Sequence, residues 1–317
     1  MDMQAFLDPL VRLLEAECSP DTVRMIEAGG SSDALWQAIS ASGYLDALVP
    51  EDAGGAGLDL STLAPILMAL GAYAVPLPVA DTMAARALLA QAGRDAPQGS
   101  IVLMAKDSRW PVLSGHLASW ALVQRADTLV LARIKEAAST GVFGDLSAYV
   151  TLGEGDVVGT APAGGLSALA AILRAAAIAG AADRLLAQTT AYANERVQFG
   201  KPIGKQQAIQ HQLAVMAQYA VAARLAAQTG CAAGLTPSLQ AAASAKYMAS
   251  TAASEVAAIA HAVHGAMGIS AEFDLQLLTK RLHAWRLADG AETYWAERLG
   301  TLRLAADLSS LDFIRTI

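Results

Sequence analysis

The chain has 317 residues, of which 54% are hydrophobic and 16% are charged, and its formal net charge is −7. Ordinary soluble domains have roughly 45–50% apolar and about 25% charged residues, so this composition is shifted toward burial. We therefore expect a large subunit interface, because one chain of this size can hide only part of such a surface. The negative charge argues against a nucleic-acid partner, since phosphate binding requires a basic face.

Membrane insertion would also explain an apolar composition, but the sequence argues against it. A spanning helix needs about 18–20 apolar residues in a row, and the most apolar stretch, 166–182, is interrupted by Arg174. The cysteines Cys18 and Cys231 are far apart, which fits reduced thiols, and the N-terminus lacks the basic start and apolar core of a signal peptide. We therefore expect a cytoplasmic protein.

Residues 1–97 are predicted to form an N-terminal helical domain. Leucines such as Leu10 and Leu14 recur at helical spacing. A loop rich in glycine, at 49–58, breaks the helical pattern, and a further helix is predicted from about 60 to 72.

Residues 98–160 have a different pattern, typical of antiparallel strands. Short β-branched runs are bounded by Gly, Asp, Ser or Pro, and they lie at 101–104, 121–123, 128–132 and 149–152. This region is predicted to be a reduced β domain with room for about five strands.

Residues 161–317 are predicted to form a C-terminal four-helix bundle. The expected helices lie at 167–196, 205–229, 238–263 and 285–307. Many alanines in the first of these helices predict a close approach of helix axes. The predicted fold is thus mostly α, with one small β module between two helical parts.

Three motifs carry a family resemblance. They are Gly43-Tyr44-Leu45 with Pro50-Glu51 and Gly54-Gly55-Ala56-Gly57; Arg196-Val197-Gln198-Phe199-Gly200-Lys201-Pro202-Ile203 with Gln207 to His211; and His264-Gly265-Ala266-Met267-Gly268 with Glu272-Phe273-Asp274-Leu275. Their order, and the plan of helices, β unit and bundle, resemble the acyl-CoA dehydrogenases. The resemblance implies an FAD-dependent enzyme that oxidises the Cα–Cβ bond of an acyl-CoA thioester.

The second motif would contact the cofactor. An arginine at a helix end beside a Phe-Gly turn offers a planar donor fork for a diphosphate and an apolar face for a ring. The resemblance makes Arg196, Gln198 and Phe199 contacts to an FAD bound by a neighbouring subunit, with His264 and Gly265 near the same diphosphate. Alternatively, Arg196 neutralises the helix C-terminus, Phe199 belongs to the core, and His264 only packs.

The catalytic base departs from the family pattern. The family's usual base is the glutamate of an aromatic-Glu-Gly-Thr turn, and the matching segment here is 287–291, with an aspartate at Asp289. Some relatives place the base on the first bundle helix, but Ala170 stands at that position. Asp289 is therefore the candidate base, and the alternative is that this aspartate is only solvated or caps a helix.

The β module departs further from the pattern of the family. The family's segments that hold the flavin ring and the acyl-CoA are missing, and only 110–115 and 127–133 resemble later strands of that domain. We therefore expect a subunit that pairs with a longer acyl-CoA dehydrogenase chain, which would supply the base and most of the substrate pocket. By analogy, bulky acyl groups such as sterol side-chain thioesters would suit an enlarged pocket.

Three alternatives stay open. The chain could be a homo-oligomeric acyl-CoA dehydrogenase that uses Asp289 as base. It could be an architectural partner with no flavin contact. It could also be a flavin monooxygenase on the same fold, since the family's usual glutamate is absent.

Overall fold

The structure is a computed structural model that describes residues 4–105, 109–270 and 273–317. Glu272 of the third motif lies outside the described residues. The N-terminal part is helical, as expected from its leucine spacing. Its helices are α1 Gln4–Glu17, α2 Pro20–Glu27, α3 Asp33–Ala41, α4 Leu60–Ala72 and α5 Val79–Gln91, with short 3-10 turns η1 Tyr44–Asp46 and η2 Glu51–Ala53 between α3 and α4.

A four-stranded sheet follows, and it corrects the expectation of an antiparallel module. The strands are β1 Ile101–Met104, β2 Trp120–Arg125, β3 Thr128–Ser139 and β4 Ala148–Thr160, in the order β1-β2-β3-β4. β2, β3 and β4 pair antiparallel, but β1 runs parallel to β2. Adjacent parallel strands need a crossover connection, which a run of short hairpins does not provide.

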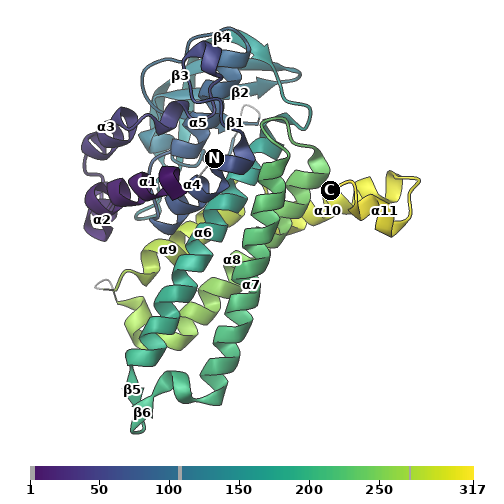
Figure 1. Cartoon of the computed structure of the whole chain (residues 1–317). Coiled ribbons are helices and arrows are strands. Elements are labelled where there is room, and N and C mark those ends of the chain that lie inside the picture. The colour runs from purple at the N-terminus through teal and green to yellow at the C-terminus, as the bar shows by residue number, and fades with distance from the viewer. Residues whose placement is uncertain (1–3, 106–108, 271–272) are drawn as a thin grey trace.

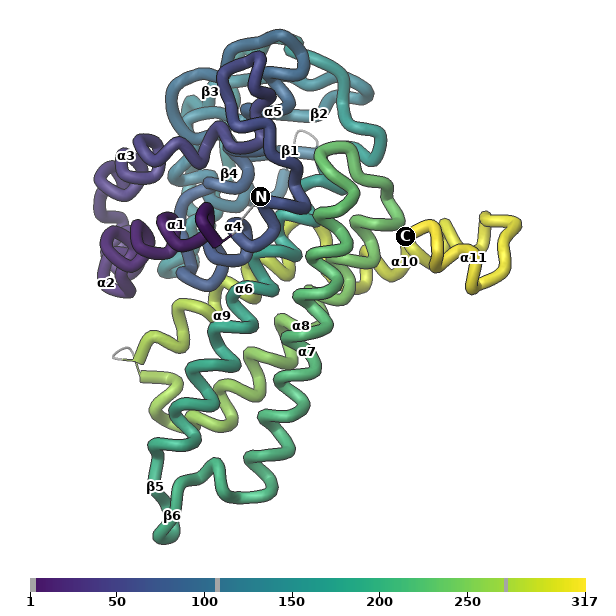
Figure 2. The backbone as a smooth tube through the Cα atoms, viewed as in Figure 1, coloured from purple at the N-terminus to yellow at the C-terminus, as the bar shows by residue number. Residues whose placement is uncertain are grey.

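The C-terminal part is a bundle of long helices, which Figure 1 shows side by side below the sheet. Its members are α6 Gly165–Glu195, α7 Gln207–Ala232, α8 Leu239–His264 and α9 Leu275–Leu287, followed by α10 Glu292–Ala305 and α11 Ser310–Ile314. The expected single helix over 285–307 is wrong. The chain turns at 288–291, so α9 completes the bundle, while α10 starts against α8 with Trp295 in the core and then extends to the side together with α11 (Figure 2).

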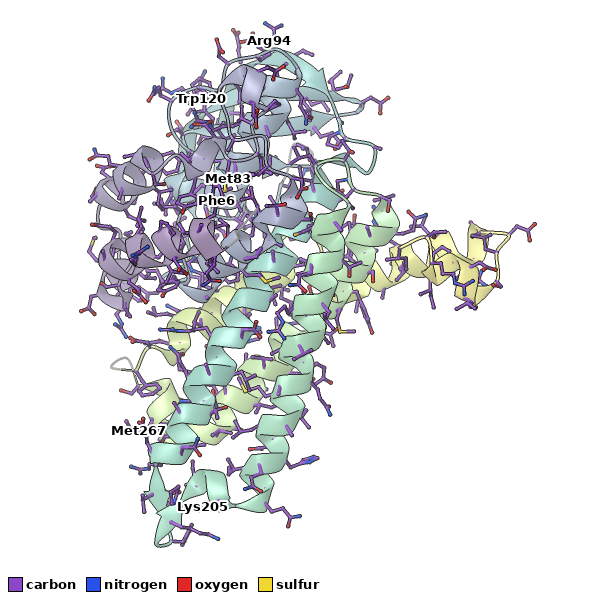
Figure 3. The ribbon with its side chains drawn as sticks, in the orientation of Figure 1. Phe6, Met83, Arg94, Trp120, Lys205 and Met267 are labelled. Atoms are coloured by element: carbon purple, nitrogen blue, oxygen red, sulfur yellow. The ribbon has the colours of Figure 1, made fainter. Side chains whose placement is uncertain are left out.

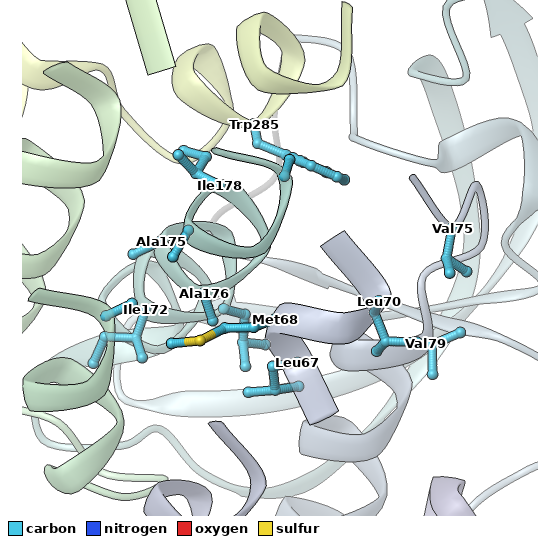
Figure 4. Close-up of a cluster of buried hydrophobic side chains, with 14 of the residues drawn as sticks. Leu67, Met68, Leu70, Val75, Val79, Ile172, Ala175, Ala176, Ile178 and Trp285 are labelled. Carbon is cyan, nitrogen blue, oxygen red and sulfur yellow. The ribbon is translucent and has the colours of Figure 1, made fainter. Parts of the chain in front are cut away.

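The main core lies where α4 crosses α6. Leu67 and Met68 of α4 face Ile172 and Ala176 of α6 (Figure 4). At this crossing a β-carbon added to Gly180 would lie 1.8 Å from the Met68 carbonyl oxygen. Such backbone contact confirms the close approach that the alanine-rich sequence predicts.

Helix α6 is long and apolar enough to cross a membrane by length and composition alone. Of its most apolar window, however, 89% is buried within the fold. Packing against α4, α7, α8 and α9 therefore accounts for its apolar character.

Candidate active site

The turn between α9 and α10 carries Asp289 in a strained conformation. Its φ is +55°, in the left-handed region that non-glycine residues rarely adopt. The Trp295 indole Nε1 donates a hydrogen bond of 2.9 Å to the Asp289 carbonyl oxygen, and Arg286 donates from Nε to the Glu292 carboxylate at 2.9 Å. The turn is thus held from both sides, as a strained backbone conformation requires.

Asp289 belongs to a buried array of charges. The Arg174 guanidinium on α6 donates from Nε to Asp289 Oδ2 at 3.1 Å and from Nη2 to Asp81 Oδ2 at 2.7 Å. Burial opposes the charge of Arg174, but the carboxylates of Asp81 and Asp289 outweigh it and raise its pKa. Burial raises the pKa of Asp289, although the Arg174 guanidinium opposes this shift.

A lysine lies behind the same turn. Lys246 on α8 is fully buried, and its Nζ donates to the carbonyl oxygens of Arg286 at 2.8 Å and Gly290 at 2.7 Å, and to Ser250 Oγ at 3.1 Å. Burial lowers the pKa of Lys246 to about 7, with the Asp289 carboxylate opposing the shift. The array thus places two cations and two carboxylates around one turn.

Asp289 lines a cavity of about 430 Å³. Its walls are mostly apolar, and the side-chain polar groups among the described lining residues include those of Ser167, Arg174, Asp289 and Tyr294. A second cavity of about 640 Å³ adjoins it, and the two share the wall residues Trp110, Pro111, Leu113, Leu287 and Ala288. A carboxylate with a raised pKa in an apolar cavity is suited to accept a proton from carbon.

The candidate cofactor turn lies at the opposite end of the bundle. Arg196 ends α6, and a small hairpin of β5 Val197–Gln198 and β6 Lys201–Pro202 follows it. Phe199 at the hairpin tip is 90% exposed with a φ of +52°. The alternative that Phe199 belongs to the core is therefore wrong, and Arg196 and Gln198 are exposed as well.

His264 and Gly265 lie at this same end. The His264 ring is buried, stacks on Tyr192 with ring centroids 4.3 Å apart, and hydrogen-bonds through Nδ1 to the Ala260 carbonyl oxygen at 2.8 Å. Burial lowers its pKa. The side chain thus packs on Tyr192, its buried Nε2 has no hydrogen-bond partner among the described residues, and Gly265 is exposed with its backbone accessible. Figure 3 places Lys205 and Met267, from the two neighbouring turns, at this end of the bundle.

The structure therefore groups the predicted residues into two separate sites. Arg196, Gln198 and Phe199 lie near His264 and Gly265 because Val263 packs on Ile203 beside the hairpin. Asp289 lies elsewhere: roughly 20 residues of helix separate its partner Arg174 from Arg196, a length of about 30 Å.

The two ends differ in how well they fit FAD. The exposed Arg196 and Phe199 fit a diphosphate and an aromatic ring, as a donor fork and an apolar face should. The cavity beside Asp289 fits the flavin ring less well, because its described walls are mostly apolar and their neutral side-chain donors are few: Ser167, Tyr294 and Trp110. Across the described residues, no group of three or more His, Cys, Asp or Glu side chains is placed to hold a metal ion.

Sequence reasoning missed Asp81 and Lys246 and treated Arg174 only as a break in an apolar run. A signal was present for two of them: Arg174 and Lys246 each interrupt an alanine-rich helical segment that otherwise reads as core. Charged residues at such positions are almost never fully buried unless paired.

Two family models match the chain: the N-terminal domain of acyl-CoA dehydrogenase over residues 2–100 and the C-terminal domain over 167–300. Neither of these covers 101–166, where the β module lies. The acyl-CoA dehydrogenase IpdE2 of Mycolicibacterium smegmatis is 33% identical over 284 residues, which is 87% of this chain and 90% of the relative. IpdE2 of Mycobacterium tuberculosis is 32% identical over 293 residues, 89% of this chain and 91% of the relative.

Solved structures share the fold. The ChsE4-ChsE5 complex from Mycobacterium tuberculosis matches with a TM-score of 0.83 at 20% identity, covering 97% of this chain and 99% of the other. A variant of the Tcur3481-Tcur3483 steroid ACAD matches with a TM-score of 0.83 at 23% identity, covering 96% and 98%. Family models match both helical parts, and a relative is 33% identical over 87% of the chain, so the chain belongs to the acyl-CoA dehydrogenases, a family of FAD-dependent oxidoreductases.

Proposed function

We propose that the chain is a subunit of a heteromeric acyl-CoA dehydrogenase, and that it completes an FAD site on a longer sister chain. One observation carries the proposal. The Arg196–Phe199 turn is exposed and lies about 30 Å of helix from the cavity of its own chain. A dinucleotide held by this turn therefore extends into a neighbouring protomer. The two-chain name of the ChsE4-ChsE5 complex supports a heteromer.

The residues of this chain act mainly by binding. The Arg196 guanidinium would hold the diphosphate through its N–H donors, Gln198 would add an amide, and the Phe199 ring would cover an apolar face. When bound, FAD supplies the acceptor for the β hydride. The sister chain supplies the ring contacts that this β module lacks.

Flavin content tests the proposal. The chain is purified alone and after coexpression with a longer acyl-CoA dehydrogenase chain of the same organism, and bound FAD is measured by absorbance after desalting. We expect FAD to stay with the assembly, and Arg196→Ala to raise its dissociation constant about 10–100-fold, because charged hydrogen bonds contribute about 1.5–3 kcal/mol. Arg94→Ala, an exposed arginine at the other end of the molecule, is the control.

Two results would contradict this assignment. Stoichiometric FAD in a homo-oligomer of this chain would exclude the heteromer. FAD occupancy that Arg196→Ala leaves untouched would instead favour an architectural subunit.

A bulky, uncharged acyl group suits the site. The two adjoining cavities together give more room than a short linear chain fills. The positive charge of Arg174 is already balanced by Asp81 and Asp289, so it does not favour a negatively charged group on the acyl part of the substrate. The steroid ACAD among the structural neighbours supports a ring-bearing thioester.

The second candidate is an acyl-CoA dehydrogenase that uses its own Asp289 as base, and the position of Asp289 in the cavity wall favours it. Asp289→Asn is then expected to lower dye-coupled oxidation of acyl-CoA about 10²–10⁴-fold, the usual contribution of a general base. Wild-type activity should fall as the pH drops through the raised pKa of Asp289, because the carboxylate must be deprotonated to act.

The control for this test is Asp307→Asn, which neutralises an exposed aspartate beyond α10. Full activity of the Asp289→Asn variant would assign the base to the sister chain.

A cytoplasmic location is part of the same proposal. Cys18 and Cys231 are both free and buried, and burial raises the pKa of each thiol to about 12. Such thiols are inert packing groups, which fits a reducing compartment.

A further inference from the structure

Lys246 uses its whole hydrogen-bonding capacity on one turn of the molecule. An ammonium group has three donors, and the three acceptors of Lys246 are Ser250 Oγ and the carbonyl oxygens of Arg286 and Gly290. Arg286 lies in the last turn of α9, where carbonyl groups have no partner within the helix. The lysine therefore donates hydrogen bonds to carbonyl groups that the backbone of the turn does not pair.

The two carbonyl groups lie on either side of Asp289. Lys246 thus reaches from α8 to both flanks of the residue, while the indole of Trp295 donates to the Asp289 carbonyl oxygen at 2.9 Å. Arg174 fixes the Asp289 carboxylate from α6 at 3.1 Å. A φ of +55° persists only where the surroundings over-determine it, and these contacts come from three different helices.

Packing alone does not call for a lysine here. The neighbouring buried positions of α8 are alanines such as Ala242, Ala245 and Ala249. Burying an ammonium group costs free energy, whereas burying an apolar side chain at this position would not. The hydrogen bonds of Lys246 to the turn offset that cost. The charged groups that face Lys246 are Asp289, Arg174 on α6, Glu292 on α10 and Arg286 on α9.

We propose that Lys246 is a positioning residue for Asp289: its ammonium group holds the α9–α10 turn so that the carboxylate stays against Arg174 and faces the cavity. This inference rests on the second candidate function, in which Asp289 acts as the base. Lys246 is fully buried and is not among the described lining residues of the cavity. Its effect is transmitted through the backbone of the turn.

Hydrogen exchange of the full chain in its flavin-bound assembly tests the contact directly. In Lys246→Met, which keeps the length of the side chain but removes its donors, we expect the amides of 287–292 to exchange at least about 10-fold faster. Amides at the hairpin end of α6 should not change. Lys135→Met, which makes the same replacement at an exposed lysine on β3, is the control and should leave both regions as in the wild type.

Steady-state kinetics then separates positioning from general stability. We expect Lys246→Met to lower kcat about 10²-fold with little change in KM, since a misplacement of about 1 Å has that effect on a reacting group. In an Asp289→Asn background the same change should have no further effect on kcat. Lys246→Gln, which keeps two N–H donors, should fall between the wild type and Lys246→Met, and it replaces the latter if that variant does not fold.

Two outcomes would overturn the inference. One is unchanged exchange at 287–292 in both variants. The other is a loss of kcat that is as large in the Asp289→Asn background as in the wild-type background. If the wild-type assembly does not oxidise acyl-CoA, the proposed function fails, and the exchange result alone decides whether Lys246 holds the turn.

Discussion

Arg174→Met is expected to destabilise the folded chain by about 3–5 kcal/mol, the usual effect of removing one partner from a buried ion pair. Arg174 is 7% exposed and contacts the carboxylates of Asp81 and Asp289, so its loss leaves two buried anions without a counter-charge on α6. Leaving Asp81 unpaired costs more free energy than leaving Asp289 unpaired, because Asp81 is only 1% exposed. Chemical denaturation followed by circular dichroism measures the change in free energy of unfolding.

Two further variants show whether charge is the cause. Arg184→Met makes the same replacement on an exposed face of the same helix, and we expect a change within about 1 kcal/mol there. The triple variant with Asp81→Asn, Arg174→Met and Asp289→Asn removes all three charges together. It should recover much of the lost stability, because it leaves no desolvated carboxylate without a counter-charge, and of the array's four charged groups it retains Lys246. A triple variant as unstable as the single one would assign the effect to lost packing.

The helices and the cofactor turn were accessible from the sequence because their signals are local. Apolar spacing within one segment marks a helix such as α4, and the Phe199-Gly200 turn follows directly on the end of α6. Exposure of this turn could not be read from the motif itself, because it depends on what the rest of the fold leaves uncovered. Whether the turn contacts FAD stays a prediction.

The errors arose where partners come from distant segments. The parallel pairing of β1 with β2 depends on the path of the chain across the sheet, which strand patterns do not record. The break at 288–291 was missed because Gly290 is the one strong helix-breaking residue in this segment. The hydrogen bonds to this turn come from Lys246, which lies 40 residues or more earlier in the chain. The array around Asp289 likewise joins α5, α6 and α8, which no local motif brings together.

Helix propensity alone predicts the wrong sign for the effect of replacing the glycines at the crossing of α4 and α6 by alanine. In a helix interior, alanine is more favourable than glycine by about 1 kcal/mol. At Gly180, however, a β-carbon would lie 1.8 Å from the Met68 carbonyl oxygen, and at Gly71 it would lie 2.0 Å from that of Ala177. These contacts are to backbone atoms, which cannot rotate away as a side chain can.

Gly180→Ala is therefore expected to destabilise the fold by about 3 kcal/mol, the upper end of ordinary overpacking, because the two helices must move apart. Gly300→Ala on α10 is the matched control: nothing lies within 4 Å of its added β-carbon, so it should gain up to about 1 kcal/mol from helix propensity. Free energies of unfolding of the two variants should thus change with opposite signs. Equal stabilisation by both substitutions would show that α4 and α6 do not approach this closely. The same result would weaken the placement of Arg174, since α6 carries it from this crossing to the cavity.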